Sequence, residues 1–84
     1  MIAQHVSDKN EIVTIYIPLL NEGIEVSRPT KALILDFNRY KVFGINGGTP
    51  ENEEWKFSPG SIVECLLKNV NKQNVLIAYK SVEL

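Results

Sequence analysis

The chain has very few of the residues on which thiol and metal chemistry depend. Its 84 residues include one cysteine, Cys65, and one histidine, His5. A single cysteine cannot form an intramolecular disulfide, and one cysteine with one histidine is too few for a zinc site. Small secreted domains often need disulfides, which this chain cannot form within itself. We therefore expect a cytoplasmic protein that binds no metal.

The chain also lacks an excess of either charge and a long apolar segment. Nine Lys and Arg residues stand against ten Asp and Glu residues, a net charge of −1. Proteins that bind nucleic acids by counterion release are usually clearly basic, so this balance disfavours that class. The apolar stretch at 12–20 is interrupted by Thr14 and Pro18, and it is shorter than the roughly 20 residues that a membrane-spanning helix needs. We expect no membrane association, and we identify no signal peptide.

Motifs for catalysis and cofactor binding are missing too. A catalytic nucleophile needs a base beside it, but His5 lies in an unpatterned segment and Cys65 lies in an apolar strand, where a buried thiol is inert. The turn at 47–50 (GGTP) lacks the motif and context of a phosphate-binding loop. The acidic residues of 51–54 lack the spacing of a calcium loop. We predict no catalytic residue and no cofactor, and we expect that the protein is not an enzyme.

What the sequence does contain is a dominant period of two, which is typical of β-strands. Turn-forming residues recur about every 8–12 residues, a spacing typical of small barrels and sandwiches. Strands are predicted at 12–17, 24–27, 32–37, 40–45, 61–68 and 75–80. We predict an all-β fold, a single small SH3-like β-barrel of about five to six antiparallel strands. The barrel is expected to cover residues 11–84 and to follow a loosely ordered arm at 1–10.

Two local expectations follow from this pattern. Arg28-Pro29 should end or bend the strand before it, because proline has no backbone N–H to donate to a ladder. In the next strand, alternation places Leu33, Leu35 and Phe37 on one face. Beyond these strands, 46–60 is the longest segment without a strand pattern.

A candidate binding face combines an arginine, an acidic loop and the only tryptophan of the chain. Tryptophan and arginine are enriched at the energetic centres of protein interfaces. We predict a partner-binding face formed by Arg28, Glu51, Glu53, Glu54 and Trp55. Two other interpretations stay open: Trp55 packs in the core, and Glu53 or Glu54 bonds Arg28 within the barrel.

A second set of residues supports a different class of function. Arginine and lysine alternate with aromatic rings in two short stretches, as they do in barrels that bind nucleic acids. RNA or single-stranded DNA binding is therefore the alternative to protein binding. The residues concerned are Arg39, Tyr40, Lys41, Trp55, Lys56 and Phe57.

Four stretches of the chain also carry a resemblance. They are 17–23 (IPLLNEG), 26–29 (VSRP), 39–40 (RY) and, most distinctively, 50–65 (PENEEWKFSPGSIVEC). In these stretches the chain resembles a family of short, uncharacterised bacterial proteins predicted to be small β-barrels. The resemblance implies a single-domain bacterial protein and carries no assigned activity.

These observations favour a non-catalytic protein-interaction module of a bacterial cytoplasm, whose partner is another protein. A small, acidic, stand-alone protein also fits an immunity or antitoxin-like role. Strand addition at an open barrel edge, giving a homodimer, is a further interpretation. An enzyme would need a deeper pocket than so small a core can supply.

Overall fold

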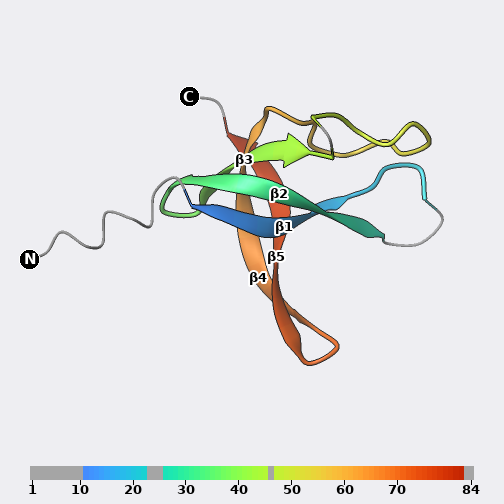
Figure 1. The fold of residues 1–84 in the computed structure, drawn as a ribbon. Helices are drawn as coiled ribbons and strands as arrows, with labels where there is room; N and C mark the ends of the chain where they lie inside the picture. The colour runs from blue at the N-terminus through green and yellow to red at the C-terminus, as the bar shows by residue number, and fades with distance from the viewer. Residues whose placement is uncertain (1–10, 23–25, 46, 83–84) are drawn as a thin grey trace, which may run out of the picture.

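Five strands follow one another along the chain in the computed structural model, which describes residues 11–22, 26–45 and 47–82. The expected arm at 1–10, which includes His5, lies outside the described residues. The strands, labelled in Figure 1, are β1 (Ile12–Pro18), β2 (Ser27–Asp36), β3 (Arg39–Gly44), β4 (Ile62–Val70) and β5 (Gln73–Val82).

The five strands form a closed barrel in the order β1-β2-β3-β4-β5. Each strand is antiparallel to the next one in the chain, whereas β1 and β5 are parallel and pair at Tyr16 and Ile77. The parallel pair follows from the odd number of strands, because strands that alternate in direction leave the first and the fifth pointing the same way. The predicted all-β, small SH3-like barrel is confirmed, with one parallel pair where only antiparallel pairs were expected.

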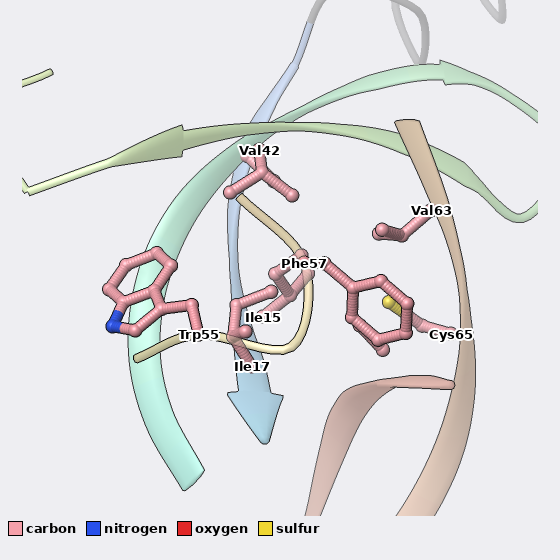
Figure 2. Packing of buried hydrophobic residues seen from close by; sticks show 9 residues of the cluster. Ile15, Ile17, Val42, Trp55, Phe57, Val63 and Cys65 are labelled. Carbon is pink, nitrogen blue, oxygen red and sulfur yellow. The ribbon is translucent and has the colours of Figure 1, made fainter. Parts of the chain in front are cut away.

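The barrel interior is filled by side chains that alternate along the strands. β1 contributes Ile15 and Ile17, which are fully buried, and β3 contributes Val42. Trp55 and Phe57 enter the same cluster from the loop between β3 and β4, as Figure 2 shows. The other buried members of the cluster are Ala32, Val63, Cys65 and Ala78. The core interpretation therefore holds for Trp55, of which 8 % is exposed.

Arg28-Pro29, expected to end or bend a strand, does not end one. Both residues lie within β2, where Arg28 pairs with Ile17 and Pro29 with Tyr16. The pairing of β2 with β3 begins only at Lys31. One side of Pro29 therefore has no neighbouring strand among the described residues. A proline is tolerated at such an edge because no strand there needs a hydrogen bond from its nitrogen.

The prediction that Phe37 shares a strand face with Leu33 and Leu35 is wrong, because β2 ends at Asp36. The buried positions of β2 are Thr30 and Ala32, and Phe37 is 95 % exposed. Two irregularities in the pairing of β2 with β3 interrupt the simple alternation. The turn to β3 begins at Phe37 itself, so this side chain lies at the tip of a hairpin.

The hairpin of β4 and β5 is longer than predicted. Its turn is only the pair Asn71-Lys72, and both residues have a positive φ, as the favoured type I′ hairpin turn requires. Within the described residues β3 pairs with β4 only from Ile62 to Glu64, and β1 pairs with β5 only at Ile77. The remaining part, which we call the projecting ribbon (residues 66–76), extends beyond the barrel as two strands (Figure 1).

Candidate functional site

The loop between β3 and β4 carries most of the predicted binding face, and it packs closely against the chain that follows β1. Leu19 and Trp55 form an isolated antiparallel bridge. The N–H of Lys56 donates to the carbonyl of Pro18 at 2.9 Å, and the N–H of Leu20 donates to the carbonyl of Glu54 at 2.7 Å. This short ladder fixes the acidic part of the loop beside the barrel.

Three of the five predicted face residues are brought together around one carboxylate. The Nε of Arg28 donates to Oε1 and Oε2 of Glu53 at 3.2 and 3.0 Å, and its Nη2 forms an ion pair with the same carboxylate. The indole Nε1 of Trp55 donates to Oε1 of Glu53 at 3.0 Å. The Glu53 side chain is only 9 % exposed. This cluster links β2, the loop and the core.

The electrostatics of the cluster follow from these contacts. The hydrogen bonds from Arg28 and then Trp55 hold the pKa of Glu53 below its usual value, although some desolvation opposes them. The hydrogen bond to Glu53 and its negative charge raise the pKa of Arg28. Both groups therefore stay charged near neutral pH and satisfy one another.

The other two predicted face residues are not part of this cluster. The carboxylate of Glu54 accepts a hydrogen bond from the side-chain amide of Asn21. Glu51 is exposed at the outer turn of the loop. Arg28, Glu53 and Trp55 thus hold the loop against the barrel. The exposed side of Arg28, together with Glu51 and Glu54, lies on the surface.

The residues predicted for nucleic-acid binding do not form one surface. Trp55 and Phe57 are buried, and Tyr40 packs partly against the core, where desolvation raises its pKa. Arg39 forms an ion pair with Asp36, at 3.7 Å between Nη1 and Oδ2. The aromatic rings are therefore turned away from solvent, where bases would have to stack.

Cys65 lies inside the barrel, as the sequence predicts. Burial raises the pKa of its thiol to about 12. A thiol that stays protonated at neutral pH is a poor nucleophile. Within the described ranges, no three His, Cys, Asp or Glu side chains gather as the ligands of a metal ion would.

A groove that the sequence did not reveal lies between the projecting ribbon and the ends of β1 and β2. Its volume is about 730 Å³, within the range of pockets that hold small ligands or a few side chains. Tyr16 and Pro18 of β1 and Ser27 of β2 form one side. Leu66 and Ile77 are among the residues of the hairpin that line the other side.

The groove combines apolar side chains with positive charge. Lys56 and Lys68 line it, and the described lining residues include no Asp or Glu. The groove lies apart from the predicted face: Ser27 lines it, but Arg28 pairs with the buried Ile17, so its side chain points to the other face of β2. One sequence signal could have indicated the groove. Residues 65–67 (CLL) place apolar side chains on both faces of a strand, so other residues are needed to cover each face.

The fold and this surface define a small five-stranded barrel with a projecting ribbon and a lysine-lined apolar groove. No protein-family model, curated protein or solved structure shows significant similarity to the chain. The resemblance to short bacterial proteins thus stays a prediction. Among the residues that the structure describes, no helix has the length and apolar character to span a membrane.

Proposed function

We propose that the protein is a non-catalytic protein-interaction module whose main binding surface is the projecting ribbon and its groove. The observation that supports this most is the exposure of apolar residues on the ribbon. Leu66 and Val70, which line the groove, are 56 and 41 % exposed, and Leu67 on the opposite face is 67 % exposed. A chain of this size has a thin core and few apolar side chains to spare, and exposed apolar groups that cluster mark interaction sites.

The predicted face stays in the proposal as a second, charged surface. The exposed part of Arg28, with Glu51 and Glu54, offers polar groups of the kind that surround the apolar centre of a protein interface. The bacterial and cytoplasmic setting and an immunity or antitoxin-like role remain expectations from size, charge and resemblance.

The test is a tagged pull-down from a nuclease-treated lysate of the source organism, quantified by mass spectrometry. The variant Leu66→Asp places a charge in the groove, and Ile12→Asp is the matched control, because Ile12 is 49 % exposed on β1 outside the groove. We expect one protein to be retained by wild type and Ile12→Asp and lost with Leu66→Asp. Circular dichroism must show that both variants are folded.

Two outcomes would contradict the proposal. Retention of one protein by all three forms would place binding elsewhere on the molecule. Capture of RNA, or of proteins that disappear when nuclease is added, would favour the nucleic-acid alternative instead, and binding should then fall steeply with salt.

A further inference from the structure

We propose that the groove binds an extended segment of a partner protein that carries carboxylates and apolar side chains. This proposal rests on the proposed protein-binding function and names the partner's chemistry. Three features of the groove support it: the spacing of its apolar side chains, its uncompensated positive charge and the free strand edge beside it.

The apolar wall of the groove is one face of the hairpin. Pairing places Leu66 opposite Ile77 and Lys68 opposite Val75, and these side chains share a face with Val70. Residues two apart on a strand are roughly 7 Å apart on one face. Alternate side chains of an extended segment have the same spacing, so each can contact one side chain of this wall.

The charge of the groove selects acidic segments. Lys56 and Lys68 both line it, and neither forms an ion pair within the described part of the chain. The Nζ of Lys56 lies 5.7 Å from the centre of the Phe57 ring, which leaves its hydrogens available to an acceptor. Carboxylates beside the apolar side chains of a bound segment would meet these lysines.

The edge of β5 beside the groove favours an extended conformation. In a two-residue hairpin the closing pair, here Val70 and Gln73, is hydrogen-bonded, and the pattern then alternates. Asn74 therefore directs its backbone groups away from β4, whereas the edge at Leu76 adjoins the bridge between Ile77 and Tyr16 of β1. The same alternation in β4 is visible at Cys65, whose N–H donates outward to Oδ1 of Asn38 at 3.3 Å. Free strand edges of this kind bind extended peptides by adding a strand.

Two other occupants fit the groove less well. Single-stranded nucleic acid could stack on Tyr16 and Tyr79, but two lysines neutralise few phosphates and the chain has a net charge of −1. A second copy of the chain would bring a second lysine-lined groove against the first in a two-fold dimer, where like charges repel.

The experiment selects binders from a phage-displayed library of random linear peptides, using the intact protein as bait. The charge-reversed variant is Lys56→Glu with Lys68→Glu, and Lys41→Glu is the control, because Lys41 is an exposed lysine outside the groove. We expect wild type and Lys41→Glu to select peptides in which Asp or Glu flanks apolar residues. The charge-reversed variant should bind these peptides at least about tenfold more weakly and should itself select basic ones.

The following results would overturn the proposal. The lysines do not select acidic segments if the selected peptides lack acidic residues. The same conclusion follows if the peptides bind the charge-reversed variant with equal affinity. Tighter binding of an oligothymidine strand would assign the groove to nucleic acid, and a dimer in sedimentation that Leu66→Asp disrupts would assign it to a second copy. If no acidic peptide binds the groove but Leu66→Asp still loses a protein partner in the pull-down, the proposed protein binding stands and only the proposal of an acidic segment is contradicted.

Discussion

At the scale of single residues, Glu53 makes the clearest pH-dependent contribution. Its pKa is lowered in the folded protein, mainly by the hydrogen bond from Arg28. A carboxyl group with a lowered pKa stabilises the fold fully above its unfolded value, about 4.3, and loses this contribution as pH falls through the folded pKa. We expect wild type to lose more stability than Glu53→Gln on acidification below about pH 4.3.

Urea denaturation at a series of pH values measures this difference. Glu51→Gln serves as the control, because Glu51 is an exposed neighbour in the same loop, and its curve should follow that of wild type. Parallel curves for wild type and Glu53→Gln would mean that Arg28 and Glu53 do not interact in solution.

Cys65 offers a second test at this scale. Its thiol is buried and its pKa is raised to about 12, so at about pH 8 the native protein exposes almost no thiolate. We expect alkylation by iodoacetamide to be slow in buffer and fast in denaturant, where the thiol recovers a pKa near 8.5. Equal rates in the two conditions would place Cys65 outside the core.

At the scale of elements, Gly44 at the end of β3 is a position where only glycine fits. Its φ is +87°, and an added Cβ would lie 2.7 Å from the backbone oxygen of Gly48 and 2.8 Å from Cγ of Pro59. Gly60 has a φ of +92° but nothing within 4 Å of the same position. A positive φ costs an alanine roughly 1–2 kcal/mol. We expect Gly60→Ala to lose about that much stability and Gly44→Ala clearly more, as thermal denaturation would show.

The strands also show which parts of the fold the sequence pattern predicts. The strands that supply the core were predictable, because their period-two alternation reflects burial on one face. Their ends were not, since Pro29 is tolerated only because β3 pairs no further than Lys31 on that side. Likewise the bend at Phe37 depends on the hairpin turn to β3. Each error arose where the neighbouring strand, which the local sequence does not specify, decides the outcome.

At the scale of the whole molecule, the candidate sites were predictable to different degrees. Opposite charges in the sequence were enough to suggest that Arg28 meets Glu53 or Glu54, and the structure selects Glu53. The groove was not predictable, because it brings Tyr16 close to Lys56 and Lys68 through the closure of the barrel. Contacts between residues so far apart in the chain produce no periodic pattern in the sequence.

The projecting ribbon leads to a prediction about how stability is distributed over the molecule. Residues of β4 from Ile62 to Glu64 lie between two strands, whereas the ribbon has only its own two strands within the described residues. A two-stranded hairpin is only marginally stable by itself in water, and regions with few buried contacts open without global unfolding. The ribbon should therefore open locally while the barrel stays folded.

Amide hydrogen exchange measured by NMR tests this directly. We expect the amides of Lys68 and Val75, on the ribbon, to exchange much faster than that of Val63, in the barrel, which should exchange only on global unfolding. If an acidic peptide binds along the ribbon, exchange of the ribbon amides should slow while that of Val63 stays unchanged, because binding adds contacts to two strands that have few others. Uniform protection along β4 in the free protein would mean that another strand already covers the ribbon, and the binding surface proposed above would then be occupied by a second copy of the chain.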